Sequence, residues 1–240
     1  MNKAEWFNKQ KIMVVVAHPD DEILGLGASM NRLIEEHGAE VHVVILGEGL
    51  TSRSEKRDPE KWEDDLEIHR ANIKDAQQKI GYDSVSIYDF PDNRFDTVPL
   101  LDFIKTVEKE KKTFRPDIIF THHGGDVNID HQRTFEAVIT ACRPMKDENV
   151  STIITFETPS GTEWRASSDP RHFVPNMFIS FSEEHLKSKT DAMECYKFEK
   201  RDYPHPRSEK ALEIRAAYWG QSVGTSYAEA FYIVRSIIKN

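Results

Sequence analysis

A histidine and three carboxylates stand directly behind an apolar run in the stretch VVVAHPDDE, residues 14–22. His18 and Asp21 are close together in this stretch, and His131 ends a second polar stretch, HHGGDVNIDH, residues 122–131. Two imidazoles and one carboxylate form a set of three protein ligands that leaves a zinc position open for water or substrate. The residue types therefore predict a catalytic metal site, with Zn²⁺ as the expected ion and another divalent cation as the alternative.

Asp20 stands beside Asp21, and the two carboxylates need not do the same work. If Asp21 binds the metal, Asp20 is free to act as a general base that removes a proton from water. Pro19 stiffens the turn, and the N-terminus of a following helix favours carboxylates at this point. The simpler interpretation is that these acids only cap a helix. Capping does not account for His18 or for the distant NIDH.

The elements that position these residues follow an alternation of short apolar runs with longer amphipathic stretches, which is typical of βαβ units. We expect a Rossmann-like α/β fold, with a mostly parallel sheet flanked by helices and additional strand and helix elements toward the C-terminus. The predicted strands are residues 11–17, 40–46, 84–90, 116–122, 150–157 and 177–181. The predicted helices are residues 21–37, 59–80, 98–112, 131–142, 182–200 and 207–219.

A polar cluster follows each of the first four predicted strands. HPDDE follows the first strand, GEGLTSR (47–53) the second, DFPDNRFD (89–96) the third and HHGGDVNIDH the fourth. Ligands of open parallel sheets bind outside the carboxyl ends of the strands, so all four clusters belong to one edge. A single cluster of this kind is an ordinary solvated loop, whereas four at one edge favour a binding site.

The composition limits the class of protein. A chain of 240 residues with 38% hydrophobic residues is long enough for one domain over residues 1–240. Its net charge of -9 argues against nucleic acid as a partner. The only cysteines, Cys142 and Cys195, suggest neither a disulfide framework nor a cysteine zinc site and fit a reducing, cytoplasmic setting. The polar start MNKAEWFNKQK does not resemble a signal peptide, and no apolar run approaches membrane-spanning length.

The motif AHPDDE after a first strand, with a downstream DH that opens a helix, resembles the PIG-L/LmbE-like family of zinc-dependent N-deacetylases. GEG after the second strand and PDNR after the third extend the resemblance over most of the chain. The resemblance implies hydrolysis of an N-acetyl group on an N-acetylglucosamine-type sugar or conjugate, as in cell-surface polysaccharide or glycoconjugate biosynthesis. It assigns His18, Asp21 and His131 as metal ligands and Asp20 as the general base.

One position departs from the family pattern. Members have a histidine three residues before the ligand histidine, where it helps to stabilise an oxyanion, and here that position is Asn128. An asparagine amide can donate a hydrogen bond to an oxyanion but cannot supply a proton. The general-acid role is therefore open between Asp20 itself, His122, His123 and His205. Among the histidines we favour His205, because a proline on each side holds it in an extended loop.

The second and third loops are expected to bind substrate. Glu48 is predicted to accept hydrogen bonds from sugar hydroxyls, and Arg53 and Arg94 to bind hydroxyls or an attached phosphate. The simpler interpretation makes each arginine a member of a surface ion pair. Asp130 is grouped with these residues, and we expect it to orient a neighbouring side chain from behind the ligands.

The expected partner is a small amino sugar, either free or linked to a nucleotide or lipid carrier, and a homo-oligomer is compatible with the sequence. The alternative is a non-catalytic sugar- or nucleotide-binding α/β protein. GLGASM (25–30) is not a G-x-G-x-x-G motif and lies inside the first predicted helix, and nearby acids would repel a pyrophosphate. Metal content and acetate release distinguish these alternatives.

Overall fold

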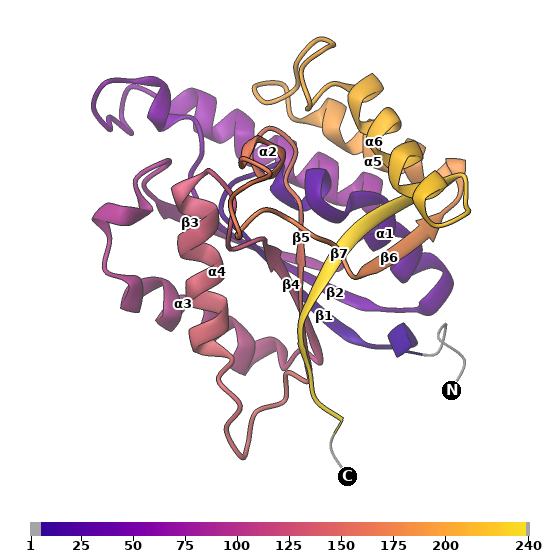
Figure 1. Ribbon diagram of the computed structural model, residues 1–240. Helices are drawn as coiled ribbons and strands as arrows, with labels where there is room; N and C mark the ends of the chain where they lie inside the picture. The colour runs from indigo at the N-terminus through magenta and orange to yellow at the C-terminus, as the bar shows by residue number, and fades with distance from the viewer. Residues whose placement is uncertain (1–5, 239–240) are drawn as a thin grey trace.

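A seven-stranded sheet with the strand order β3-β2-β1-β4-β5-β7-β6 forms the centre of the molecule (Figure 1). The computed structural model describes residues 6–238, so the two ends of the predicted domain, 1–5 and 239–240, lie outside the described residues. The strands are β1 (Lys11–Val16), β2 (Glu40–Gly47), β3 (Ser84–Phe90), β4 (Ile118–His122), β5 (Thr152–Phe156), β6 (Met177–Phe181) and β7 (Tyr227–Ser236). The helices are α1 (Asp21–His37), α2 (Glu63–Ile80), α3 (Leu100–Phe114), α4 (Ile129–Ala141), α5 (Glu183–Cys195) and α6 (Glu209–Ser222). The predicted fold class is confirmed.

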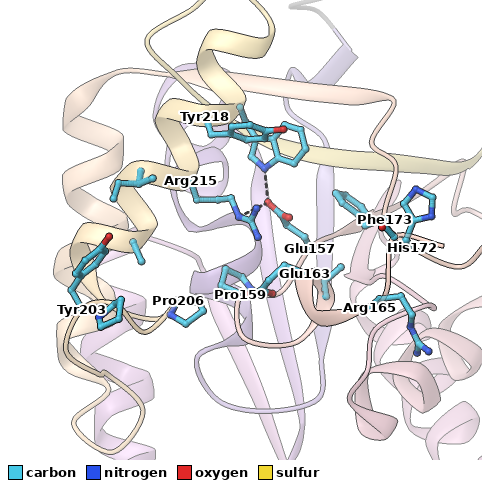
Figure 2. Close-up of a pocket in the computed structure, with 16 residues that line it drawn as sticks. Glu157, Pro159, Glu163, Arg165, His172, Phe173, Tyr203, Pro206, Arg215 and Tyr218 are labelled. Carbon is cyan, nitrogen blue, oxygen red and sulfur yellow. Dashed lines mark hydrogen bonds and ion pairs between the residues drawn. The ribbon is translucent and has the colours of Figure 1, made fainter. Parts of the chain in front are cut away.

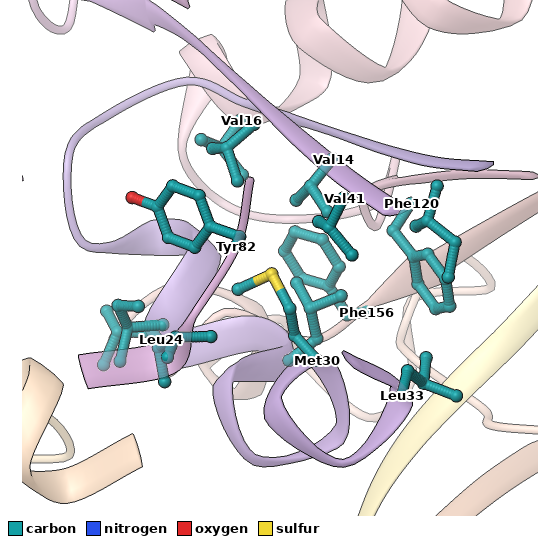
Figure 3. Close-up of a cluster of buried hydrophobic side chains, with 14 of the residues drawn as sticks. Val14, Val16, Leu24, Met30, Leu33, Val41, Tyr82, Phe120 and Phe156 are labelled. Atoms are coloured by element: carbon teal, nitrogen blue, oxygen red, sulfur yellow. The ribbon is translucent and has the colours of Figure 1, made fainter. Parts of the chain in front are cut away.

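Side chains of β1 alternate between two apolar cores. Ile12, Val14 and Val16 belong to the core under α1, α2 and α5, part of which is shown in Figure 3. Met13 and Val15 belong to the core under α3 and α4, which lie on the opposite face of the sheet (Figure 1). Because β1 is covered on both faces, its sequence is a nearly continuous apolar run.

Several helices and strands begin and end at the residues predicted from the sequence. α1, β3 and β6 span the predicted residues. Gly38 and Gly81 end α1 and α2 with left-handed φ values of 61° and 91°, a conformation that glycine adopts without steric cost. The other predicted bounds differ by a few residues, which is usual for helix and strand ends. None of the described helices is both long and apolar enough to cross a membrane.

Strand β7 was missed by the sequence analysis. It lies between β5 and β6 and runs antiparallel to both, whereas β1 to β5 pair in parallel. Glu229 interrupts its apolar pattern, but this carboxylate is buried and lies 2.6 Å from Nζ of Lys189 on α5. A buried ion pair of this kind cannot be recognised from residue periodicity, since its partner is 40 positions away.

Candidate active site

The two polar stretches with metal-ligand chemistry meet because β1 and β4 are neighbours at the centre of the sheet. After β1 the sheet continues through β2 on one side, whereas β4 and β5 continue it on the other. Such a switch point opens a crevice between the two loops. The loop after β1 carries His18 and Asp20 and leads to Asp21, the first residue of α1, and the loop after β4 leads to His131 in the first turn of α4.

The three predicted ligands converge. Nδ1 of His18 lies 3.4 Å from Oδ2 of Asp21, and Nε2 of His131 lies 3.5 Å from the same oxygen. One ligand atom from each residue falls in a group whose members are all within 4.8 Å of one another. Ligands bound about 2.0–2.1 Å from a tetrahedral Zn²⁺ are themselves about 3.4 Å apart. The donor set and its spacing therefore fit one cation of this kind.

Each imidazole of the set has a carboxylate behind it. Nε2 of His18 lies 2.9 Å from Oδ2 of Asp130, and Nδ1 of His131 lies 3.2 Å from Oδ2 of Asp126. Both carboxylates are fully buried. Carboxylates in this position fix the orientation of a ligating imidazole and increase its basicity. Asp130 lies behind the ligands and not against the pocket, and Asp126 was missed because no motif singles it out.

The electrostatic environment favours positive charge at this point. Burial by itself lowers the pKa of His18, but hydrogen bonds with Asp130 and Asp21 outweigh it and raise that pKa well above its ordinary value. Burial likewise opposes a charged His131, whereas the charges of Asp21 and Asp126 raise its pKa to about 9. The carboxylates thus stabilise positive charge by more than burial disfavours it. A site with this property is suited to a divalent cation.

Asp20 does not act as a helix cap, although it immediately precedes α1. Its side chain makes no capping hydrogen bond, and its backbone is held at φ 106°. Oδ2 of Asp20 instead lies 3.2 Å from Nη1 of Arg207, which also contacts Glu199 at 2.7 Å. Burial raises the pKa of Asp20 well above its ordinary value, while the charge of Arg207 opposes that rise. This arrangement argues against the simpler interpretation of the acidic cluster.

Backbone strain is concentrated around the same point. Six non-glycine residues in the described chain have positive φ, and four of them line one pocket: Asp20, Leu50, Asn93 and Ser160. Such conformations cost about 1–3 kcal/mol each and gather at functional sites. The pocket has a volume of about 180 Å³, and its lining comes from all four predicted loops and from C-terminal segments.

Asn128 and Arg53 both line this pocket. Oδ1 of Asn128 accepts a hydrogen bond from the backbone N–H of Asp130 and so caps α4. Nδ2 of Asn128 is therefore left to donate, and it does so to Oδ1 of Asn93 at 3.1 Å. Arg53 donates to Oε1 of Glu199 at 2.6 Å, so the guanidinium is held at the pocket wall.

Glu48 and Arg94 are outside the set of residues that line the pocket. The carboxylate of Glu48 accepts two hydrogen bonds from Arg57, both at 2.9 Å, and a third from Thr51 at 2.6 Å. Arg94 donates to the backbone oxygen of Glu55 at 3.2 Å. These two side chains hold loop segments together, and the structure does not bring them to the pocket beside the predicted ligands.

The structure does not bring His123 or His205 to the pocket either. Nε2 of His123 lies 2.7 Å from the backbone oxygen of Arg171. Nδ1 of His205 accepts a hydrogen bond from the backbone N–H of Arg207. The guanidinium of Arg207 in turn donates a hydrogen bond to Asp20. In this loop it is Arg207, and not the predicted His205, that lines the pocket.

His122 is also unsuited to donate a proton. It is buried and stacks on His131 with 3.9 Å between ring centroids. Its Nε2 accepts a hydrogen bond from the backbone N–H of Ala17, and its Nδ1 lies 2.9 Å from Oγ1 of Thr158. Burial lowers its pKa to about 4, so the ring is neutral and both nitrogens are occupied.

Two further residues of the site were missed. Glu22 is buried, and its carboxylate accepts hydrogen bonds from the hydroxyl of Tyr196 at 2.5 Å and from the backbone N–H of Asp20 at 3.1 Å. It thereby supports the unusual backbone at Asp20. His69 lines the pocket, and neither of its ring nitrogens has a hydrogen-bond partner within the described residues.

A family model described as "PIG-L: GlcNAc-PI de-N-acetylase" matches residues 13–142, which is more than half of the chain. The chain belongs to the PIG-L family. This confirms the predicted resemblance and supports a hydrolytic deacetylase. The Escherichia coli K12 protein named "Uncharacterized deacetylase YaiS" is 29% identical to this PIG-L protein over 196 residues, which cover 79% of this chain and 92% of the relative.

Solved structures share the fold over nearly the whole chain. The conserved protein TT1542 from Thermus thermophilus is 20% identical with a TM-score of 0.73, covering 96% of this chain and 97% of that one. An N,N'-diacetylchitobiose deacetylase from Pyrococcus horikoshii is 17% identical with a TM-score of 0.75, covering 97% and 86%. GalB, a 4-carboxy-2-hydroxymuconate hydratase from Pseudomonas putida, is 19% identical with a TM-score of 0.72, covering 96% and 98%. Since the fold carries both deacetylases and a hydratase, the site must decide the reaction.

Proposed function

We propose that this PIG-L protein is a zinc-dependent N-deacetylase that hydrolyses the N-acetyl group of an N-acetylglucosamine-type sugar or sugar conjugate. The observation that carries the proposal is the convergence of His18, Asp21 and His131 beside the buried Asp20. These three side chains would hold the ion. When bound, Zn²⁺ supplies a Lewis acid that polarises a carbonyl oxygen and makes water more acidic.

Asp20 is the proton-transfer residue in this proposal. Its carboxylate accepts a proton from the attacking water, and the protonated carboxyl then returns that proton to the leaving amine nitrogen. Burial, which raises the pKa of Asp20, favours a group that can hold the proton between these two steps. Arg207 keeps the carboxylate in place through its contact with Oδ2. No separate histidine acid is then required.

Asn128 and Arg53 act on the substrate. The Nδ2 group of Asn128 is the donor that would exchange its bond with Asn93 for one to the developing oxyanion. Arg53, held at the pocket wall by Glu199, would donate to sugar hydroxyls. The surrounding carboxylates repel a phosphate near the ion, so a carrier phosphate would have to lie away from them.

The proposal is tested by acetate release from the zinc-loaded protein. Free N-acetylglucosamine, a nucleotide-linked form and a lipid-linked form are each incubated with the protein, and acetate and free amine are measured together. We expect equal amounts of both products from at least one substrate, and their loss when a chelator removes the ion. Zinc-loaded protein that releases acetate from none of the three would contradict the proposal.

A further inference from the structure

A second cavity of about 550 Å³ adjoins the pocket that holds the ligands. Pro159 lines both of them. The larger cavity lies between the loop after β5 and the segment that leads into α6 (Figure 2). Every residue in its lining follows position 142, where the family match ends. This cavity is therefore outside the part of the chain that identifies the family.

Aromatic side chains stand around this cavity. Figure 2 shows Tyr203 at one side, Phe173 at the opposite side, and Tyr218 between them at the top of the view. Trp219 lies beside Tyr218, with 4.8 Å between the ring centroids in an edge-on arrangement. Its Nε1 donates to Oε1 of Glu157 at 2.5 Å, which fixes the indole. Tyr203 and Tyr218 are about half exposed, so their rings are accessible to a ligand.

Charged groups lie among these rings. Arg215 extends from α6 toward Glu157, with 3.4 Å between Nε and Oε1 (Figure 2). Arg165 and Glu163 also line the cavity. An alkyl chain would remove water from these groups without replacing its hydrogen bonds, which is costly. A sugar ring presents apolar C–H faces to aromatic rings and a hydroxyl edge to planar charged groups, so it suits this lining better.

We propose that the larger cavity binds the sugar residue next to the one that is deacetylated, so that the substrate contains at least two sugar rings. The inference rests on the proposed function, because the first ring must lie at the ligands. The turn at residues 158–160 connects the two cavities: Pro159 lines both, and Oγ of Ser160 accepts a hydrogen bond at 2.9 Å from Arg207, which contacts Asp20. A disaccharide therefore spans from the ion site across Pro159 to the aromatic side chains.

The test compares kcat/KM for acetate release from N-acetylglucosamine, from its β-linked disaccharide and from its octyl glycoside. We expect the disaccharide to exceed the monosaccharide by about tenfold, as one to two aromatic contacts would allow, and the octyl glycoside to gain less. Tyr218→Ala should remove most of that preference and leave kcat/KM for the monosaccharide unchanged. Tyr232→Ala, which replaces a similarly exposed tyrosine outside the cavity, is the matched control and should retain the preference.

Equal kcat/KM for disaccharide and monosaccharide would overturn the inference, and so would a larger gain from the octyl chain. A preference that persists in the double variant Tyr203→Ala, Tyr218→Ala would also overturn it. If no substrate releases acetate, the proposed function fails, and the cavity is then tested by disaccharide binding followed through tryptophan fluorescence. Saturable binding that is weakened by Tyr218→Ala would support the cavity, whereas no binding would reject it.

Discussion

Two cavities meet at Pro159, and their linings differ in kind. The smaller, of about 180 Å³, is lined by imidazoles, carboxylates and guanidinium groups that hold one another in place. The larger, of about 550 Å³, is lined by aromatic rings and prolines with a few charges between them. The first has the features of a reaction site and the second those of a recognition site. The two proposals therefore put the reaction at the sheet edge and selectivity on the C-terminal segments.

The two sites also differ in what supports them. His18 and Asp21 come within five residues of the end of β1, which is hydrogen-bonded to β2 and β4, and His131 lies in the first turn of α4. The second cavity is built on a loop and on α6, which packs near the antiparallel end of the sheet. Changes in the first site should therefore affect turnover of every substrate. Changes in the second should affect only substrates that reach it.

The largest effect is expected for Asp20→Asn. This variant keeps the size of the side chain but cannot accept the proton, so kcat should fall at least about a hundredfold for mono- and disaccharide alike. Acetate release and zinc content are measured on the same preparation. Full metal content with near-normal turnover would remove Asp20 from the role of base.

A smaller effect is expected for Asp126→Asn. The carboxylate behind His131 is replaced by an amide, which should weaken zinc affinity by about 10–100-fold, as measured by competition with a chelator. Asp191→Asn is the control, because that carboxylate lies on α5 and pairs with the exposed Lys187. Unchanged affinity in Asp126→Asn would mean that His131 is oriented without it.

A shift in pH dependence is expected for Arg207→Met. The charge of Arg207 lowers the pKa of Asp20 against the effect of burial, so its removal raises that pKa further. Because a base must be unprotonated to act, the acidic limb of kcat/KM should move to higher pH. Arg207→Lys retains a positive charge and should leave the limb near its original position. An unmoved limb in Arg207→Met would show that the limb belongs to another group.

The smallest effect is expected for Tyr218→Ala, and it distinguishes the functions of the two cavities. Tyr218→Ala should lower kcat/KM about tenfold for the disaccharide and leave the monosaccharide value unchanged, whereas Asp20→Asn lowers both. Parallel loss of both values in Tyr218→Ala would mean that the two cavities are not independent in function.

The sequence predicted the parts of this molecule that depend on neighbouring residues. Apolar runs and terminal glycines located β3, α1 and the end of α2, because period and capping are local properties. The alternation of strands and helices also predicted that His18, Asp21 and His131 would share one sheet edge, since parallel strands carry their following loops to the same side.

Only the tertiary structure decided the pairings between distant side chains. Arg207, and not His205, contacts the carboxylate of Asp20. Arg57 forms an ion pair with Glu48, and the carboxylate of Asp126 lies beside the ring of His131. The tertiary structure also placed β7 between β5 and β6 around a buried ion pair. Such contacts join residues far apart in the chain, and their geometry depends on how the whole sheet packs. No local period or cap encodes them, which is why the convergence of His18, Asp21 and His131 could be predicted from the sequence and the contacts around these residues could not.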